Sequence, residues 1–286
     1  KASDTFSSDD RLRRAPDAVD EFRSAIIKNY KECARIFPWR KTRDAYKILV
    51  SEMMLQQTQT LRVVPKYEAW IEAFPDAPSL ASAPFSDVLA HWNGLGYNRR
   101  AKYLQEACRE VCASYGGKFP RERKLLESLP GIGPYTAGAV AAFAFNKAEV
   151  FIETNIRSVF IFFFFGSTNE KVSDAEILPL VERTLDKTNV REWYWALMDY
   201  GAELKKRVQN PSQKSAHYAR QSPFRGSLRE ARGAIVRQLT EKKSTTLSEI
   251  ARSQGISLSR LEKAASRLLE ERFVCETKGV YRIRED

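Results

Sequence analysis

Residues 126–140 read LESLPGIGPYTAGAV and predict a short helix, a glycine-rich hairpin and a second helix. Gly131 and Gly133 permit positive φ and the close approach of another backbone. Backbone N–H groups at the start of the second helix can hold a phosphate without reading a base. A generic turn would account for the two glycines but not for the whole motif. We therefore predict that Leu129, Gly131 and Gly133 contact a nucleic-acid backbone.

The composition favours the same class of partner. Lysine and arginine number 47 against 36 aspartates and glutamates, for a net charge of +11 over 286 residues. This excess favours a polyanion such as nucleic acid over the alternative of a merely soluble basic protein. Four scattered cysteines and two distant histidines argue against a disulfide framework and against a metal centre. We expect no bound metal and a reducing, intracellular compartment.

Helical periodicity dominates residues 17–205, so we predict an all-α domain of many short helices. One of its helical patterns, residues 45–74, is expected to break at Pro65. Residues 1–16 are polar and are expected to be flexible, and residues 206–227 are expected to form a basic linker. Residues 228–286 show three helical patterns and two β runs joined by Lys278-Gly279, which predicts a small winged-helix-like α+β domain. That domain would either contact DNA or simply pack.

Two acidic residues stand in apolar surroundings. Glu52 lies in KILVSEMML, residues 47–55, and Glu153 lies in VFIETNIRSVFIFFFF, residues 150–165. A buried, unpaired carboxylate costs several kcal/mol, so such a group is neutralised, paired or functional. The second run is short and also contains Arg157, so we expect no transmembrane helix.

Five spaced motifs resemble those of the helix-hairpin-helix DNA glycosylases, the superfamily of endonuclease III. They are FPWR at 37–40, SEMMLQQTQT at 51–60, WNGLGYNRRAKYL at 92–104, YGGKFP at 115–120 and LPGIGPYTAGAV at 129–140. Within the superfamily, residues 22–205 look most like the MutY-type adenine glycosylases. The resemblance implies a fold of two helical lobes and a monomer that binds double-stranded DNA containing a mispair or lesion. In a bacterium it implies a cytoplasmic, nucleoid-associated protein.

The resemblance also implies roles for the two acids. Releasing a base requires its protonation and stabilisation of an oxocarbenium-like sugar, and two carboxylates can divide these tasks. Glu52 would protonate the purine and help position water. Glu153 stands where the family has an aspartate and would stabilise the charge at C1′; alternatively it is a helix cap or an ion-pair partner of Arg157. Tyr135 occupies the place of the Schiff-base lysine of bifunctional members, so a monofunctional enzyme is expected, with Tyr135 as a positioning group.

Further residues match DNA-contacting positions of the family. Two glutamines, Gln56 and Gln57, are expected on the helix after Glu52. Together with Tyr97 they would fill the gap left by a flipped base and wedge beside the opposite base. The alternative for Tyr97 is a core aromatic. Arg99, Arg100 and Lys102 would bind phosphates or form a solvated face. Asn155 and Arg157 are also candidate DNA contacts.

The chain departs from the MutY pattern in two places. Its MDYGA motif, residues 198–202, is followed by no cysteine through residue 224, where the family usually holds a four-iron cluster. We therefore expect no iron–sulfur cluster, and predict DNA contacts from Lys205, Lys206, Arg207, Lys214 and Arg220. The C-terminal 60 or so residues are too few and wrongly patterned for the family's Nudix-like domain, which recognises 8-oxoguanine.

Together these features predict a monofunctional DNA N-glycosylase that removes adenine opposite 8-oxoguanine or guanine. Two alternatives remain open. One is a glycosylase for another base, such as thymine or uracil opposite guanine, or a damaged base. The other is a catalytically silent, lesion-binding protein, which the glutamate at position 153 would favour.

Overall fold

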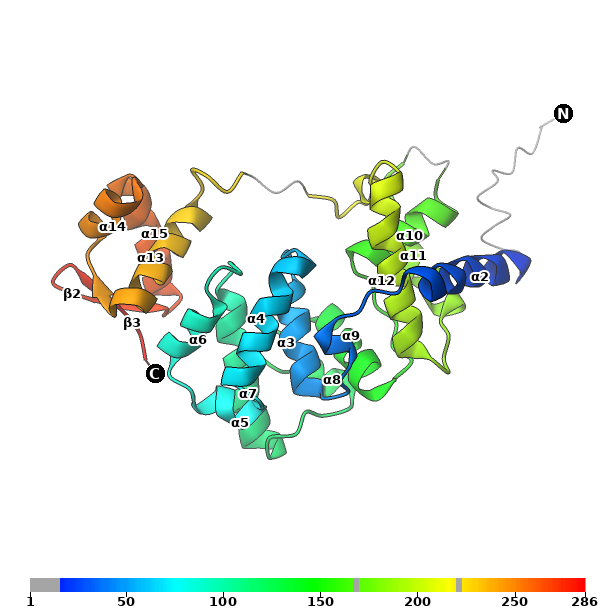
Figure 1. Ribbon diagram of the computed structural model, residues 1–286, viewed down its shortest axis with the longest axis horizontal. Helices are drawn as coiled ribbons and strands as arrows, with labels where there is room; N and C mark the ends of the chain where they lie inside the picture. Colours follow the sequence, from blue (N-terminus) through cyan, green and yellow to red (C-terminus); the bar gives the residue numbers. More distant parts are fainter. Residues whose placement is uncertain (1–15, 167–169, 220–222, 286) are drawn as a thin grey trace. The chain divides into compact units, whose positions relative to one another are not determined.

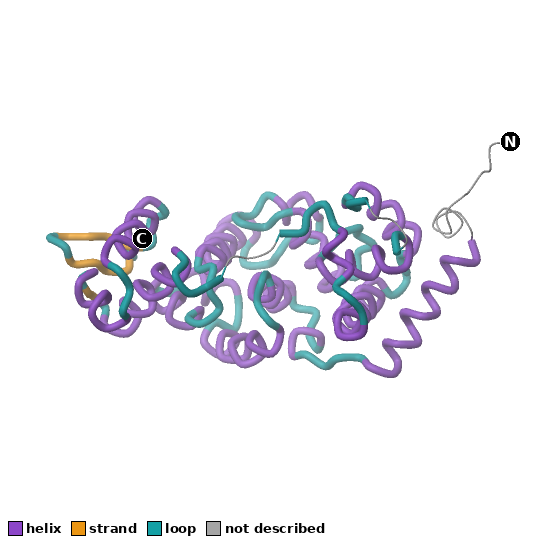
Figure 2. Tube along the Cα trace, turned by 90° about the horizontal axis from the view of Figure 1, so that it is seen from above, coloured by secondary structure: helices purple, strands orange, loops and turns teal. Residues whose placement is uncertain are grey.

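The computed structural model describes residues 16–166, 170–219 and 223–285. Most of the expected flexible N-terminus, and Arg220 among the expected DNA contacts, lie outside these residues. The chain divides into two compact units, residues 1–48, 121–127 and 133–220, and residues 49–120, 128–132 and 221–286. Helices dominate both, in agreement with the predicted fold class (Figures 1 and 2).

The first unit is built around α10 (Thr154–Phe164), the apolar run that carries Glu153 just before its start. Figure 1 shows α10 beside α11 (Asp174–Thr184), α12 (Val190–Arg207) and α2 (Pro16–Cys33). Phe22 of α2 packs its ring 5.2 Å from that of Phe160 and 6.0 Å from that of Trp193. The other elements of this unit are η1 (Pro38–Arg40), α8 (Arg123–Glu127), α9 (Pro134–Phe145) and η2 (Pro211–Lys214). The run is thus a core helix, and no described helix has the length and apolar content needed to span a membrane.

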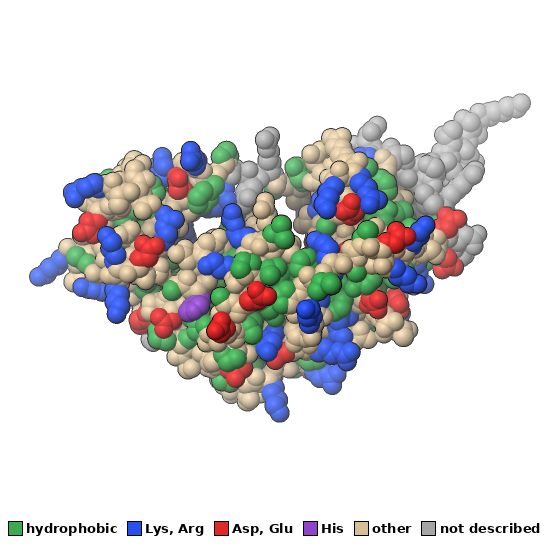
Figure 3. All heavy atoms as spheres, in the orientation of Figure 1, with side chains coloured by type: hydrophobic (Ala, Val, Ile, Leu, Met, Phe, Trp, Pro, Cys, Tyr) green, Lys and Arg blue, Asp and Glu red, His purple; other side chains and the backbone are tan. Residues whose placement is uncertain are grey.

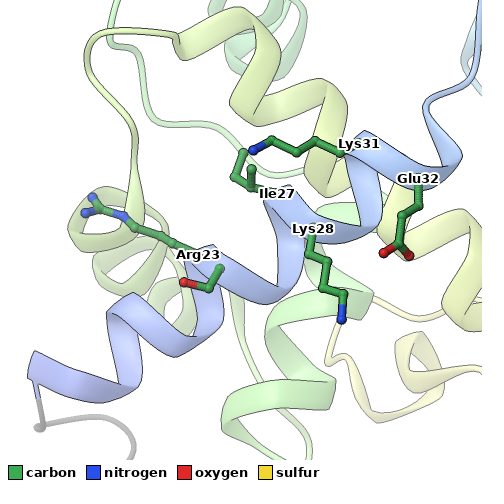
Figure 4. Close-up of a pocket in the computed structure, with 6 residues that line it drawn as sticks. Arg23, Ile27, Lys28, Lys31 and Glu32 are labelled. Carbon is green, nitrogen blue, oxygen red and sulfur yellow. The ribbon is translucent and has the colours of Figure 1, made fainter.

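Helix α2 is attached through Arg23, which extends from one side of the helix in Figure 4. Its Nε donates to the carbonyl of Thr184 at 2.9 Å, and its Nη2 to that of Leu185 at 3.1 Å. These carbonyls end α11, where backbone acceptors lack helical partners. The neighbouring shallow pocket is lined by side chains of α2 alone, so it does not gather groups from separate elements.

The second unit contains most of α3 (Ala45–Leu55), then α4 (Thr60–Ala73), α5 (Ala77–Ser82), α6 (Phe85–Trp92) and α7 (Arg99–Tyr115). The predicted break at Pro65 is wrong, because α4 continues through this proline. Its neighbours Val63, Tyr67 and Trp70 are buried, and their packing outweighs the local cost of proline. The chain breaks earlier, at Gln57, whose φ of 54° is left-handed.

The C-terminal part confirms the winged-helix-like expectation. Helices α13 (Leu228–Lys242), α14 (Leu247–Gln254) and α15 (Leu258–Glu270) precede strands β2 (Val274–Thr277) and β3 (Val280–Ile283). Strand β1 (Ser244–Thr245) completes an antiparallel sheet of order β1-β3-β2, drawn in orange in Figure 2. Lys278 and Gly279 both have positive φ, 53° and 79°, as a tight hairpin turn requires.

This C-terminal part packs on α6 and α7 within the second unit. The ring of Phe273 lies 5.6 Å from that of Phe85, at the start of α6. The carboxylate of Glu285 accepts hydrogen bonds from the backbone N–H groups of Phe85 and Ser86 at 2.6 and 3.0 Å. An anion at a helix N-terminus satisfies N–H groups that have no helical partner. Packing is therefore observed, and DNA contact by this part stays a prediction.

Candidate active site

Glu52 lies inside α3, where the sequence predicted a buried acid. Its residue is 4% exposed, and its neighbours Val50, Met53 and Met54 are at most 1% exposed. Removal from water favours the protonated form of a carboxyl group. The surroundings of Glu52 therefore suit a proton donor.

Glu153 is the N-cap of α10 and is half-buried. Its Oε1 accepts hydrogen bonds from the backbone N–H groups of Asn155 and Ile156 at 2.6 and 2.8 Å. Backbone N–H groups at a helix N-terminus have no helical partner, and the carboxylate satisfies two of them. The capping role expected as an alternative is thus observed, and Oε1 is the oxygen that caps the helix. Arg157 donates from Nε and Nη2 to the carboxylate of Asp174, at 2.6 and 2.7 Å.

Asn155 links Glu153 to Lys205 of α12. The amide Nδ2 of Asn155 donates to Oε2 of Glu153 at 3.3 Å, and its Oδ1 accepts from Nζ of Lys205 at 2.8 Å. Burial lowers the pKa of Lys205, and the nearby Glu153 carboxylate opposes this shift. The sequence singled out Lys205 only as a basic residue after MDYGA; its position beside Asn155 was not predicted.

A glycine brings α12 and α10 together at this point. A Cβ added to Gly201 would lie 2.5 Å from the carbonyl oxygen of Asn155 and 2.8 Å from its Cβ. Only a residue without a side chain fits this approach. Gly201 therefore sets the position of the turn that carries Glu153 and Asn155.

The FPWR and MDYGA motifs meet in a buried ion pair. Asp199 of MDYGA accepts from Nη1 and Nη2 of Arg40 of FPWR at 2.8 and 2.7 Å, and from Nε of Arg35 at 2.6 Å. Burial raises the pKa of Asp199, but the hydrogen bonds and charges of the two arginines outweigh it, and the pKa is lowered. These motif residues thus hold the start of the first unit against α12.

The glycine hairpin between α8 and α9 is observed, with two differences from expectation. Gly131 has a φ of 70°, and an added Cβ would lie 2.4 Å from Cβ of Tyr103. Gly133 is the extended N-cap of α9, with a φ of −86°, so it does not use the positive φ that glycine permits. Leu129 is 3% exposed, so a DNA contact there would come from its backbone. Tyr135, in the first turn of α9, packs its ring 5.9 Å from that of Phe151.

Gln56 and Gln57 lie in the turn after α3, not on the helix, because the left-handed Gln57 ends it. Tyr97 also has positive φ, 49°, and is 38% exposed, so it is not a core aromatic. Arg100 joins the two turns. Its Nη1 donates to the carbonyls of Met53, Met54 and Gln56 at 2.6–3.0 Å, and its Nη2 to those of Leu95 and Gly96.

Arg100 is therefore an internal residue, which excludes the solvated face that was one of the two alternatives for it. It is 7% exposed, and burial lowers its pKa to about 10. Arg99 and Lys102 face Glu271 of the C-terminal part: Nη2 of Arg99 lies 2.7 Å from its Oε1, and Nζ of Lys102 2.8 Å from its carbonyl oxygen. Hydrogen bonds from Arg232 and Arg99 lower the pKa of Glu271 to about 2 against the opposing effect of burial.

Comparison with known proteins agrees with this geometry. Residues 50–183 match the model of the HhH-GPD superfamily base excision DNA repair proteins. This central part of the chain is thus similar to the HhH-GPD superfamily. The matched residues include Glu52, the glycine hairpin and Glu153, whereas Asp199, Lys205 and the C-terminal part lie beyond them.

Individual proteins to which the chain is similar carry a consistent name. The chain is 39% identical over 180 residues to an adenine DNA glycosylase of Mycolicibacterium smegmatis, covering 63% of this chain and 61% of that one. It is 34% identical over 197 residues to the human adenine DNA glycosylase, covering 65% of this chain and 36% of that one. The chain thus spans less than two thirds of the length of these relatives.

Solved structures show the same fold. A thermostable thymine-DNA glycosylase superposes with a TM-score of 0.60 at 29% identity, over 69% of this chain and 92% of that one. An endonuclease III in a non-covalent DNA complex superposes with a TM-score of 0.56 at 18% identity, over 77% of this chain and 91% of that one.

The segment after α12 does not fit the iron–sulfur cluster that MutY-type members usually hold. Such a cluster needs cysteine thiolates, and residues 198–224 contain none. In this segment Ser212 of η2 shares a 2.5 Å hydrogen bond with Ser158 of α10, and Lys214 donates to the carbonyl of Gly166 at 2.6 Å. Among the described residues, no three His, Cys, Asp or Glu side chains are grouped to hold a metal ion.

Proposed function

We propose that this chain is a monofunctional DNA N-glycosylase of base excision repair that removes adenine mispaired with 8-oxoguanine or guanine. The observation that carries the proposal is Glu52, an acid 4% exposed inside α3 of the HhH-GPD domain. The names of the relatives, adenine DNA glycosylases at 39% and 34% identity, support adenine as the base.

In this reaction Glu52 gives a proton to the adenine ring. The C1′–N9 bond then breaks, its electron pair leaves with the neutral base, and the sugar becomes oxocarbenium-like. Water adds to C1′ and loses a proton, which leaves an abasic site. Tyr135 positions the nucleotide and supplies no amine, so no Schiff base forms and the strand stays intact.

The carboxylate of Glu153 stabilises the positive charge at C1′. Two backbone hydrogen bonds and the Asn155 amide hold it, which supports a preorganised electrostatic role. Glutamate is one methylene longer than the aspartate of the family pattern, and the N-cap geometry shows where its carboxylate is held. A Glu153→Asp variant tests whether this length is matched to its surroundings; we expect slower base release, because the shorter side chain withdraws the carboxylate by about 1 Å.

The test is single-turnover cleavage of a panel of duplexes. It pairs adenine with 8-oxoguanine, guanine or cytosine, and adds thymine and uracil opposite guanine. Glu52→Gln should slow adenine release by about 10²–10⁴-fold, the usual contribution of a general acid, with little loss of DNA binding. Glu68→Gln, the same change at an exposed position of α4, is the matched control and should retain full activity. Undiminished activity of Glu52→Gln removes Glu52 from its role.

A second candidate is the release of thymine or uracil opposite guanine. The 29% identity to a solved thymine-DNA glycosylase favours it. Release of these bases and not of adenine in the same panel would select it. Binding without release of any base would select the lesion-binding alternative.

We also propose that the chemistry needs no metal. Neither proton donation nor charge stabilisation in this scheme requires one, and the residues after α12 do not fit the family's cluster. Exhaustive chelation should therefore leave base release unchanged, and a large loss would contradict this part of the proposal.

A further inference from the structure

Arg123, the first residue of α8, joins three segments of the first unit through one guanidinium group. Its Nε donates to the carboxylate of Glu127 on the same helix at 2.7 Å, and its Nη2 donates to the carbonyl of Pro134 in the first turn of α9 at 3.2 Å. Its Nη1 donates to the carbonyl of Val150 at 3.0 Å and to the carboxylate of Glu149 at 3.3 Å. All three guanidinium nitrogens are therefore engaged, on α8, on α9 and on the segment that precedes α10.

The segment that precedes α10 is fixed at three consecutive residues. The carbonyl of Glu149 accepts from the hydroxyl of Tyr194, a fully buried side chain of α12, at 2.8 Å. The carbonyl of Val150 accepts from the guanidinium, and the ring of Phe151 stacks on that of Tyr194 with the ring centres 4.0 Å apart. Glu153 follows Phe151 by two residues, so a shift of these anchors would displace its carboxylate as well.

Helix α9 packs closely on the same segment. A Cβ added to Gly138 of α9 would lie 3.1 Å from Cβ of Phe151, closer than ordinary van der Waals contact. The ring of Tyr135, in the first turn of α9, lies 5.9 Å from that of Phe151. Arg123 therefore fastens this segment to the end of α9 at which a DNA phosphate is expected to bind.

A guanidinium group suits this place better than an ammonium group would. It is planar and presents five N–H donors in a fixed fork, whereas lysine presents three donors on a single rotating nitrogen. The carbonyls of Pro134 and Val150 are thereby held at a separation that the plane of Arg123 sets. Attraction to the two glutamates alone would not require hydrogen bonds to two backbone carbonyls.

A direct role in DNA binding is the alternative for Arg123. Figure 3 shows lysine and arginine side chains on the visible face around the position of α8, and Arg121 and Lys124 are exposed. Exposed cations of this kind attract phosphates. The side chain of Arg123 is only 27% exposed, and its nitrogens already have four acceptors within the protein. Its place is therefore that of a group that holds the protein and not the DNA.

We propose that Arg123 is a positioning residue of the glycosylase reaction, which holds the Glu153 carboxylate at a fixed distance from the turn that binds the DNA backbone. The inference rests on the proposed function. A phosphate held at the start of α9 fixes the sugar of the flipped nucleotide, and the carboxylate acts only if it meets C1′ of that sugar. The two groups belong to different elements, the start of α9 and the cap of α10, and Arg123 ties them together. Misplacement of a reacting group by about 1 Å costs around a hundredfold in rate, so this tie matters for catalysis.

The test compares the binding of two duplexes that cannot be cleaved. One carries a protonated pyrrolidine ring in place of the target sugar, as a mimic of the cationic transition state, and the other carries a neutral tetrahydrofuran ring. The wild-type protein should bind the cationic duplex about 10²-fold more tightly, the lower end of the range for transition-state analogues. Arg123→Met should reduce this preference and the single-turnover rate of adenine release by about tenfold each, with little change in affinity for the neutral duplex.

Three further variants define how Arg123 acts. Arg123→Lys should lose the preference to the same extent as Arg123→Met, because lysine keeps the charge without the fork. Glu153→Gln should also lose the preference, and adding Arg123→Met to it should cause no further loss, because a residue that acts through another has no effect once that other is removed. Arg121→Met, the same change at an exposed position two residues earlier, is the matched control and should keep the full preference.

The outcomes separate this inference from the proposed function. An unchanged preference in Arg123→Met, equal weakening of both duplexes, full rescue by Arg123→Lys or an additive loss in the double variant overturns the inference, as does a wild type without the preference. The readout needs no base release, so a protein that shows the expected preferences but releases no base would overturn the proposed function and leave this placement of Glu153 standing. Melting temperatures confirm that each variant is folded, and Arg123→Lys replaces Arg123→Met if the latter does not fold.

Discussion

Gly201→Ala should both destabilise the first unit and slow base release. The added Cβ would lie 2.5 Å from the Asn155 carbonyl oxygen, where ordinary contact requires about 3.5 Å. The obstacle is backbone, so α10 and α12 must separate by about 1 Å. Overpacking of this kind costs about 1–3 kcal/mol, or roughly 2–12 °C in melting temperature.

The same displacement carries Glu153 with it, because that residue caps the helix that moves. Misplacement of a reacting group by about 1 Å costs around a hundredfold in rate. The assay is single-turnover release of adenine at saturating enzyme, together with thermal unfolding. DNA binding should change far less than the rate.

Gly233→Ala is the matched control for stability. Gly233 lies within α13, and a Cβ there would meet no atom within 4 Å. Alanine at an open helical position should raise stability by about 0.5–1 kcal/mol. A Gly201→Ala protein with unchanged melting temperature and unchanged rate would refute the argument that this approach positions Glu153.

Three further perturbations test other parts of the structure. Asp199→Asn removes the charge that pairs with Arg40 and should lower the free energy of unfolding by about 3–5 kcal/mol, as measured with denaturant. Because folding lowers the pKa of Asp199, the carboxylate stabilises the wild-type protein above about pH 4, and this contribution should be lost as the pH falls further. A wild-type stability that does not change with pH in this acidic range would contradict the prediction. Arg100→Lys leaves an ammonium group with three donors in place of a guanidinium that bonds to several carbonyls. The turns that contain Gln57 and Tyr97 should then loosen, and affinity for duplex DNA should fall by about tenfold. Unchanged affinity would show that Arg100 does not hold these turns for DNA binding. Glu271 has a pKa of about 2, so its ion pairs with Arg99 and Arg232 should hold the C-terminal part on α7 down to pH 4. Limited proteolysis should detect release of the C-terminal part only as the pH approaches 2. Release above pH 4 would exclude these ion pairs as the main attachment.

The candidate site residues were predicted from signals that are local in the sequence. The LPGIG turn, the acid inside an apolar helical pattern and the acid just before an apolar run each occupy a few consecutive residues. Helix periodicity and the Lys278-Gly279 turn likewise depend on near neighbours, and the structure confirms both. The misplaced break at Pro65 arose where a local preference was overruled by packing around Trp70.

Other features depend on residues that are far apart in the chain. Arg40 and Asp199 are separated by 159 positions, and Tyr97 and Arg229 by 132. Periodicity carries no information on such pairs, because it reports which face of an element is buried and not what covers it. For the same reason the sequence described Arg100 only as one of several basic residues, whereas folding surrounds it with carbonyl groups from two turns. The sequence therefore identifies the chemical groups and the helices that carry them. The long-range packing of those helices determines which groups are held rigid and where the C-terminal domain is attached.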